Sequence, residues 1–373
     1  MRPEAAVAGA ERAERLAAEV ADSGLDQLIV GDLVRPGDSE RAGSANIRWL
    51  TGFGGTSAIS LVGPDDRVFA TDFRYAERAE REVPSVFDRV RAERQLVRAI
   101  AERMSGRVGF DDANTSVANL RKLEEVVPDG VELVPSAGLV ENLRRTKDES
   151  EVEAIAAAAS LTDEVYSWVA EAGLAGRTER DVQLAMEQRM RELGAEDPSF
   201  RAIVAAGANG ALPHHDASAH RIAEGELVVI DMGAIAGGYC SDCTRTFAAG
   251  EISDEEREVY ELVLAAQLAS LEAVRAGAPA VGVDAAAREP IGEAGHGDDF
   301  GHGVGHGVGI EVHEEPRLGP RSEDELRHGD VVTIEPGVYV PGRFGVRIED
   351  LVVVTDDGHR NLSSFPKQLQ VVR

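Results

Sequence analysis

The chain has 373 residues, of which 43% are hydrophobic and 28% charged, so its length and composition predict a globular protein with two domains. The formal net charge of -28 argues against nucleic acid or an anionic membrane as a partner, because an acidic surface repels phosphate. Neither a bilayer-spanning apolar run of about 18 to 20 residues nor a signal-peptide pattern is found, so a cytoplasmic location is expected.

The first part of the chain alternates helical and strand patterns. Apolar residues recur at helical spacing in some stretches, and short apolar runs bounded by turn residues predict strands in others. The helical patterns cover residues 11–24, 74–83 and 116–127, and the strand patterns cover residues 26–32, 57–72 and 106–112. Together they predict a small α/β domain over residues 1–142.

The second part of the chain, residues 143–373, begins with two long helical patterns. The first covers Asp148 to Ala172, and the second begins at Thr178, where a threonine followed by acidic residues is a capping signal. Strand patterns follow at residues 200–209, 225–250, 329–340 and 344–358, with helical patterns at 253–277 and 281–295. Pro290 is expected to break the last of these helices.

Four carboxylates stand within strand patterns that otherwise look like protein core. Asp231 follows four apolar residues, and for this residue alone the end of a strand or a turn is the simpler interpretation. Asp242 is expected on the returning strand, where a hairpin through residues 234–239 would bring it beside Asp231. Glu335 and Glu349 interrupt two later apolar strands. Like charges this close would bind protons or unfold the site unless divalent cations neutralised them.

The stretch "FGHGVGHGVGIEVHEEP", residues 300–316, supplies three histidines, His302, His306 and His313. One imidazole would complete a two-metal site, in which carboxylate-dominated ligation favours manganese, cobalt or iron. Two ions can share a hydroxide and polarise a carbonyl, which indicates hydrolysis of an amide or a phosphoester. The glycines miss the register of a nucleotide-binding loop, and we expect them to let the backbone pass close to the site. They also argue against a helix that would pair His302 with His306, so His302 is expected only beside the site.

Cys240 and Cys243 flank Asp242 with a C-x-x-C spacing. A structural zinc site is not expected, because there is neither a second cysteine pair nor a nearby histidine. A redox pair would need a strand-then-helix setting that this segment lacks. We therefore expect two part-buried side chains on a strand, and their closeness to Asp242 raises the hypothesis that the site is sensitive to oxidation.

Five motifs, in chain order, resemble the pita-bread-fold metallopeptidases of the Xaa-Pro aminopeptidase and Xaa-Pro dipeptidase (prolidase) branch. They are "LVVIDMG", "GYCSDCTRTF", "GHGVGHGVGIEVHEEP", "TIEPGVYV" and "GVRIEDLVVV". Near the N-terminus, "NIRWLTGF" and "ATDFRYAERA" resemble the creatinase-type N-terminal domain. The resemblance spans nearly the whole chain. It implies an α/β (α+β) fold, with a small α/β N-terminal domain followed by a pita-bread catalytic domain.

The resemblance also implies the metal ligands. Asp231 would bind one ion with both oxygens, and Asp242 and Glu349 would bridge both ions. His306 and Glu335 match the remaining ligands, on the other ion.

Further residues match positions with catalytic roles in the family. Glu335 would also pass a proton between the attacking water and the leaving amine. His313 would contact substrate near the scissile bond, and Arg347 would orient carboxylates through its planar fork. Without the resemblance, His214 and His215 would be interpreted as exposed loop histidines. The resemblance changes this for His214 alone, which would line the site and steady the reacting peptide.

The implied activity is that of an exopeptidase that cleaves between an N-terminal residue and a following proline through a hydroxide bridging two divalent ions. Mn²⁺ is the expected metal, with Co²⁺, Fe²⁺ and Zn²⁺ as alternatives, and the expected partners are small peptides with proline second and a second copy of the chain in a homodimer. Two other readings stay open: a same-fold metallo-aminopeptidase of another specificity, and a non-metal creatinase-like hydrolase or binding protein. The sequence does not distinguish a dipeptidase from an aminopeptidase.

Overall fold

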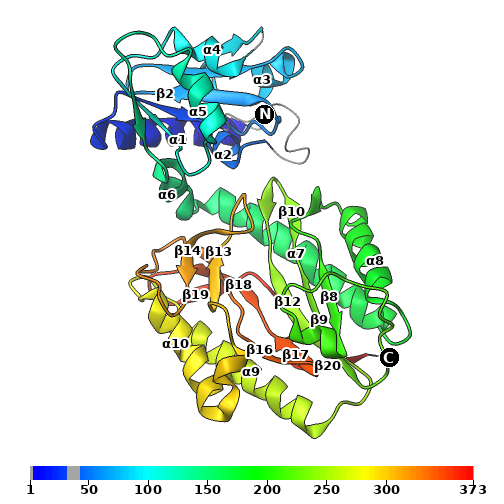
Figure 1. Cartoon of the computed structure of the whole chain (residues 1–373). Helices are drawn as coiled ribbons and strands as arrows, with labels where there is room; N and C mark the ends of the chain where they lie inside the picture. The colour runs from blue at the N-terminus through cyan, green and yellow to red at the C-terminus, as the bar shows by residue number, and fades with distance from the viewer. Residues whose placement is uncertain (1–2, 32–42, 94, 373) are drawn as a thin grey trace. The chain divides into compact units, whose positions relative to one another are not determined.

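The computed structural model describes residues 3–31, 43–93 and 95–372, and its chain divides into two compact units, residues 1–144 and 145–373 (Figure 1). Each unit combines helices and strands, as the sequence predicts. None of the described helices has both the length and the apolar character that a membrane span requires.

The first unit is built on a mixed sheet with the strand order β4-β3-β2-β1-β5-β6 among the described residues. The central strand β1 pairs antiparallel with β2 and parallel with β5. The strands are β1 (Gln27–Val30), β2 (Ala58–Val62), β3 (Arg67–Thr71), β4 (Asp88–Arg91), β5 (Arg107–Phe110) and β6 (Glu132–Pro135). The helices are α1 (Pro3–Asp22), α2 (Ala45–Thr51), α3 (Ala76–Glu82), α4 (Leu96–Ala101), α5 (Val117–Glu124) and α6 (Leu139–Arg145), the last of which runs across the division between the units.

The predicted elements of this unit are present as α1, α3 and α5 and as β1, β2, β3 and β5. Asp32, the predicted last residue of the first strand, lies outside the described residues. The structure adds short elements that the apolar pattern does not reveal. Strands β4 and β6 bury none of their residues fully, so they lack the apolar run that identifies a strand.

Four long helices belong to the second unit: α7 (Glu149–Ala172), α8 (Glu179–Glu192), α9 (Asp254–Ala273) and α10 (Ala280–Ile291). The predicted starts are confirmed, because the Asp148 side chain caps α7 and the Thr178 side chain caps α8. Pro290 lies inside the last turn of α10, and the helix ends one residue later. The shorter helical turns are η1 (Gly207–Ala211), η2 (Gly292–His296) and η3 (Gly297–Asp299).

The strands of the second unit form several small sheets. Their bounds are β7 (Asp197–Pro198), β8 (Ile203–Ala206), β9 (Glu226–Met232), β10 (Ala234–Ala236), β11 (Tyr239–Cys240), β12 (Cys243–Ala249), β13 (Gly305–Gly307), β14 (Glu314–Leu318), β15 (Val331–Ile334), β16 (Gly337–Val340), β17 (Phe344–Arg347), β18 (Asp350–Val354), β19 (His359–Asn361) and β20 (Gln370–Val372). Among the described residues, the two larger sheets have the orders β20-β12-β9-β8 and β14-β13-β15-β18-β19.

The predicted hairpin through residues 234–239 is present as β10 and β11. Gly237 and Gly238 form its turn with φ of 58° and 81°, a conformation that favours glycine. Beyond the hairpin, β9 and β12 pair antiparallel with Thr244 opposite Asp231. Asp242 therefore lies close to Asp231, although it directly precedes β12 instead of lying within it.

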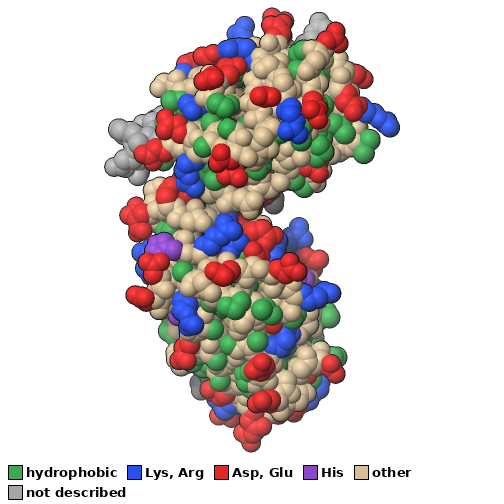
Figure 2. Space-filling model, turned by 90° about the vertical axis from the view of Figure 1, so that its left-hand side faces the viewer, with side chains coloured by type: hydrophobic (Ala, Val, Ile, Leu, Met, Phe, Trp, Pro, Cys, Tyr) green, Lys and Arg blue, Asp and Glu red, His purple; other side chains and the backbone are tan. Residues whose placement is uncertain are grey.

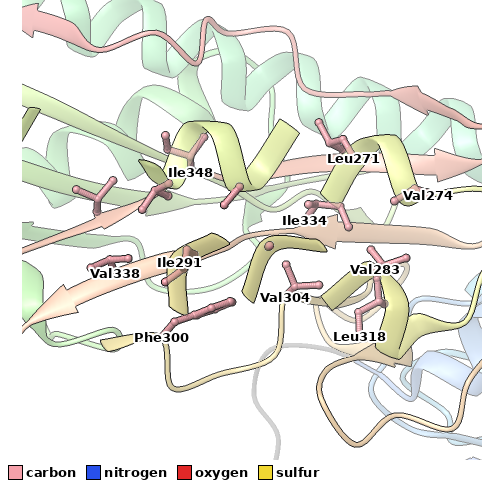
Figure 3. Packing of buried hydrophobic residues seen from close by; sticks show 14 of the residues in the cluster. Leu271, Val274, Val283, Ile291, Phe300, Val304, Leu318, Ile334, Val338 and Ile348 are labelled. Atoms are coloured by element: carbon pink, nitrogen blue, oxygen red, sulfur yellow. The ribbon is translucent and has the colours of Figure 1, made fainter. Parts of the chain in front are cut away.

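A hydrophobic core lies between helices α9 and α10 and the strands that carry the site (Figure 3). Leu271, near the end of α9, and Val283 of α10 contribute to it from the helical side. Ile334 of β15 and Ile348, which follows β17, contribute from the strands and are completely buried. This core therefore fixes the strand segments that end in Glu335 and Glu349.

Candidate metal centre

A cavity of about 790 Å³ opens in the second unit. All eight predicted site residues line it: His214, Asp231, Asp242, His306, His313, Glu335, Arg347 and Glu349. They come from segments that are far apart in the sequence and that the fold brings together.

Strand alternation explains why acidic side chains face this cavity. Asp231, Glu335 and Glu349 each directly follow a completely buried isoleucine. Because successive side chains of a strand point to opposite faces, burying the isoleucine in the core turns the acid toward the cavity. Asp231 lies within β9, whereas Glu335 and Glu349 lie just beyond β15 and β17, in the breaks before the next strands.

The closest group of potential metal ligands consists of Asp242, His306 and Glu349. Each offers one ligand atom, and these atoms all lie within 4.8 Å of one another. His306 Nε2 is 3.6 Å from Asp242 Oδ2 and 3.4 Å from Glu335 Oε1. The other ring nitrogen, Nδ1, donates to the carbonyl of Gly307 at 3.0 Å, which leaves the Nε2 lone pair directed toward the carboxylates.

The raised pKa values of the buried acids indicate that a cation is needed to keep them ionised. Burial raises the pKa of Asp242 and Glu349, and the negative charges of neighbouring carboxylates raise both further. Burial also raises the pKa of Glu335, to about 7, against the opposing effect of Arg347. Burial lowers the pKa of His306 to about 3, so its ring is neutral and able to bind metal. These buried acids are therefore ionised together only when a positive charge lies among them.

Asp231 provides a separate test of whether a metal fits. Its Oδ2 accepts a hydrogen bond from Arg347 Nη2 at 2.6 Å, but its Oδ1 is buried and has no hydrogen-bond partner among the described residues. A buried carboxylate oxygen without a partner is costly, and metal coordination would satisfy it. The donor set of four carboxylates and one imidazole thus fits divalent cations.

Arg347 is the centre of a hydrogen-bond network that includes residues the sequence did not reveal. It is buried and donates to Asp231, to Thr244 Oγ1 at 3.0 Å and to the Tyr339 hydroxyl at 2.9 Å. Thr244 in turn donates to Glu349 Oε2 at 2.7 Å. The expected role of Arg347, orienting carboxylates, is compatible with these contacts. Thr244 and Tyr339 gave no signal, because threonine and tyrosine are ordinary strand residues.

His302, expected only beside the site, lines the cavity. Its Nδ1 donates to the Gly303 carbonyl at 2.8 Å, and its Nε2 accepts from the Tyr339 hydroxyl at 2.9 Å. Burial lowers the pKa of His302 to about 4. With both ring nitrogens engaged, His302 is not available as a metal ligand.

The remaining histidines differ in their surroundings. His214 and His313 are solvent-exposed and line the cavity, and the ring centre of His313 is 4.5 Å from that of His306. The expectation that His215 is an exposed loop residue is wrong. Its side chain is only 12% exposed, because its ring is hydrogen-bonded to the buried Glu179.

Cys240 and Cys243 are free thiols on β11 and β12, as expected, but they are fully buried. Cys243 Sγ donates to the carbonyl of Glu349, and Cys240 Sγ donates to the carbonyl of Ile310. Neither belongs to the group of potential metal ligands found among the described residues.

Comparison with known proteins shows which families the two parts of the chain match. Residues 153–356 match "Metallopeptidase family M24", and residues 12–146 match "Creatinase/Prolidase N-terminal domain". The Xaa-Pro dipeptidase of Pyrococcus furiosus is 39% identical over 255 residues, which cover 68% of this chain and 70% of that protein. The predicted order of domains, a creatinase-type domain followed by a metallopeptidase domain, is confirmed.

Solved structures are similar over almost the whole chain. The Xaa-Pro dipeptidase from Bacillus anthracis has a TM-score of 0.90 and 35% identity, with 98% of this chain and 100% of that chain covered. The X-Pro aminopeptidase from Thermotoga maritima has a TM-score of 0.87 and 33% identity, with 97% and 100% covered.

Proposed function

The chain belongs to metallopeptidase family M24, and on that premise we propose that it hydrolyses the peptide bond between an N-terminal residue and a following proline. The observation that carries the proposal is the buried cluster of acids around His306, which has the chemistry of a divalent-metal site. The Xaa-Pro specificity rests on the relatives described above. We assign the reaction to residues 143–373 and treat residues 1–142 as the N-terminal domain.

Two divalent ions would be held by Asp231, Asp242, His306, Glu335 and Glu349, with Asp242 and Glu349 shared between them. When bound, the ions supply Lewis-acid polarisation of the scissile carbonyl and lower the pKa of water at the site. Manganese is the proposed metal, because four carboxylates and a single imidazole form a predominantly oxygen donor set, and cobalt, iron and zinc are the alternatives.

The chain's own side chains would perform the remaining tasks. Glu335, 3.4 Å from His306, would take a proton from the attacking water and deliver it to the nitrogen of the leaving proline. Arg347 holds Asp231 in a fixed orientation through the 2.6 Å ion pair. His214 and His313 contact the peptide from the cavity wall, since both line the cavity without occupying the carboxylate cluster.

A dipeptide is the proposed substrate class, because the relatives include Xaa-Pro dipeptidases. An aminopeptidase acting on longer peptides is the second candidate, because the structure of an X-Pro aminopeptidase is also similar. The homodimer and the cytoplasmic location remain predictions from the sequence.

A substrate panel tests the proposal. The purified protein, supplied with Mn²⁺, is assayed on Xaa-Pro dipeptides, on tripeptides with proline second, and on dipeptides without proline. We expect the first group to be hydrolysed fastest. Faster cleavage of the tripeptides would favour the aminopeptidase, and equal rates on proline-free dipeptides would refute the proline preference.

A further inference from the structure

His214 lies on a loop between β8 and β9, residues 207–218, which we call the His214 loop. Its side chain is solvent-exposed and lines the cavity. Within the described residues, the structure records no hydrogen bond to the His214 ring. The place of this ring therefore depends on the backbone of the loop that carries it.

The carboxylate of Glu179, in the first turn of α8, joins the two ends of this loop. Glu179 is completely buried, and its Oε1 accepts hydrogen bonds from the backbone N–H of Ala206 and from Asn209 Nδ2, both at 2.9 Å. Its Oε2 accepts from His215 Nε2 at 2.8 Å. The same oxygen accepts from the backbone N–H and the hydroxyl of Ser218, at 3.0 and 2.7 Å.

These bonds keep the Glu179 carboxylate ionised. Burial raises its pKa, but the hydrogen bonds from Ala206, Asn209, Ser218 and His215 outweigh burial and lower the pKa to about 2. Charge-assisted hydrogen bonds of this kind are stronger than neutral ones. A buried charge with this many donors is therefore a stiff attachment point for the loop.

The other side of the His214 loop rests on the strand that carries Arg347. The carbonyl of Pro213 accepts a hydrogen bond from Arg347 Nη1 at 3.3 Å. Gly210 lies against Gly345, where a Cβ on Gly345 would come within 1.9 Å of the Gly210 carbonyl oxygen. The loop is thus held between Glu179 on α8 and Arg347 on β17.

We propose that Glu179 is a positioning residue, whose carboxylate fixes the His214 loop so that the His214 ring is presented to the reacting peptide. This inference rests on the proposed function, because His214 has a peptide to contact only if the cavity binds one. His215 has a different role from His214: it donates a hydrogen bond to Glu179 and so helps to hold the loop.

The first test measures the loop itself and needs no substrate. In Glu179→Gln, the side chain keeps its size but loses its charge. One accepting oxygen is also replaced by an NH2 group, which cannot accept hydrogen bonds from the loop. Hydrogen–deuterium exchange is followed by mass spectrometry on peptides from residues 207–218, with metal content measured in parallel. We expect these amides to exchange at least about tenfold faster while metal content stays at the wild-type level. Unchanged exchange would overturn the proposal.

A milder variant covers the case in which Glu179→Gln does not fold. Ser218→Ala leaves Glu179 in place and removes the 2.7 Å hydroxyl bond to Glu179, together with the 3.0 Å bond that this hydroxyl accepts from the backbone N–H of His220, outside the loop. Exchange in residues 207–218 should still accelerate, by about two- to fivefold. No acceleration in Ser218→Ala would count against the proposal as directly as in the first variant.

The second test asks whether Glu179 acts through His214. Glu179→Gln should lower kcat about tenfold or more with little change in KM, since a small misplacement of a substrate-contacting group has effects of this size. In a His214→Ala background, the same substitution should change kcat less than about twofold. If the two reductions multiply, Glu179 does not act through His214 and the proposal fails.

A control removes a partly exposed carboxylate that likewise accepts several hydrogen bonds elsewhere in the unit. Asp163 accepts hydrogen bonds from Ser364 N, Ser364 Oγ and Phe365 N, far in sequence from the His214 loop. Asp163→Asn should leave kcat and exchange in residues 207–218 unchanged. If the wild-type protein hydrolyses no Xaa-Pro peptide, the proposed function fails, and the exchange experiment still decides whether Glu179 fixes the loop.

Discussion

Asp242 and Glu349 are the two carboxylates that group with His306 in the cavity. Both offer an atom within 4.8 Å of His306, and the pKa of each is raised by burial and by neighbouring negative charge. A protein that buries these acids together needs a compensating cation. We therefore expect metal binding, and with it activity, to depend on these two residues.

Asp242→Ala and Glu349→Ala should each lower activity more than about a hundredfold, because removing a shared ligand takes away several kcal/mol of charge stabilisation in the transition state. Activity and bound metal are measured on the same samples, the latter by mass spectrometry. His302→Ala is the matched comparison and should keep its metal, since Tyr339 and Gly303 engage both ring nitrogens. Two ions bound in either acid variant, with normal turnover, would contradict the ligand assignment.

The carboxylate of Glu179 gives the protein a pH-dependent component of stability. Its pKa is lowered from 4.5 to about 2, so this component is fully present above about pH 4.5 and is lost as the pH falls toward 2. The Glu179→Gln variant has no carboxylate at this position and therefore lacks this pH-dependent component of stability. The melting temperature of wild type should therefore exceed that of the variant at pH 6, and the difference should shrink between pH 4.5 and 2. A difference that stays constant over this range would show that the Glu179 charge is not responsible.

Sequence reasoning found Asp231, Glu335 and Glu349 because each ends or interrupts an apolar run, which is a costly and therefore informative event. It found Asp242 because the expected hairpin would bring this residue beside Asp231. The same reasoning could not find Glu179 or Tyr339. Glu179 stands at the start of a helix, where an acid is common and needs no explanation beyond capping. Tyr339 is a typical strand residue, and only the folded chain brings its hydroxyl to Arg347 and His302.

At the level of secondary structure, the glycines of residues 300–316 allow strands to approach closely. A Cβ on Gly305 would lie 1.9 Å from the carbonyl oxygen of Thr333, and one on Gly307 would lie 2.2 Å from that of Glu315. Because glycine is uncommon in strands, β13 could not be predicted from the sequence. The expectation that these glycines let the backbone pass close to the site agrees with this geometry.

Two glycines of this stretch provide a matched pair. Gly305→Ala forces a Cβ against the backbone of β15 and should lower the free energy of unfolding by about 1–3 kcal/mol, with loss of bound metal at His306. A Cβ on Gly301 meets nothing within 4 Å, so Gly301→Ala should leave both quantities near the wild-type values. Thermal unfolding and metal analysis of both variants check this. Equal behaviour of the pair would refute the close-approach explanation.

For the whole molecule, the sequence predicted two α/β parts and the long helices, because helical periodicity over many residues is a strong signal. It could not predict the strand order β4-β3-β2-β1-β5-β6, since pairing between distant segments leaves no local pattern. The charge of -28 is carried at the surface as well as in the site, and Figure 2 shows acidic side chains over much of the visible face of each unit. The acids of the metal centre are a small part of that total.

We propose that the buried carboxylates and His306 hold the ions on which Xaa-Pro hydrolysis depends. The most direct test is a titration of Mn²⁺ into chelator-treated wild-type protein, with hydrolysis of an Xaa-Pro dipeptide followed at each step. We predict negligible activity without metal, and activity that rises until about two ions are bound per chain. Full activity in the chelated protein, or metal binding that restores no Xaa-Pro hydrolysis, would contradict the account.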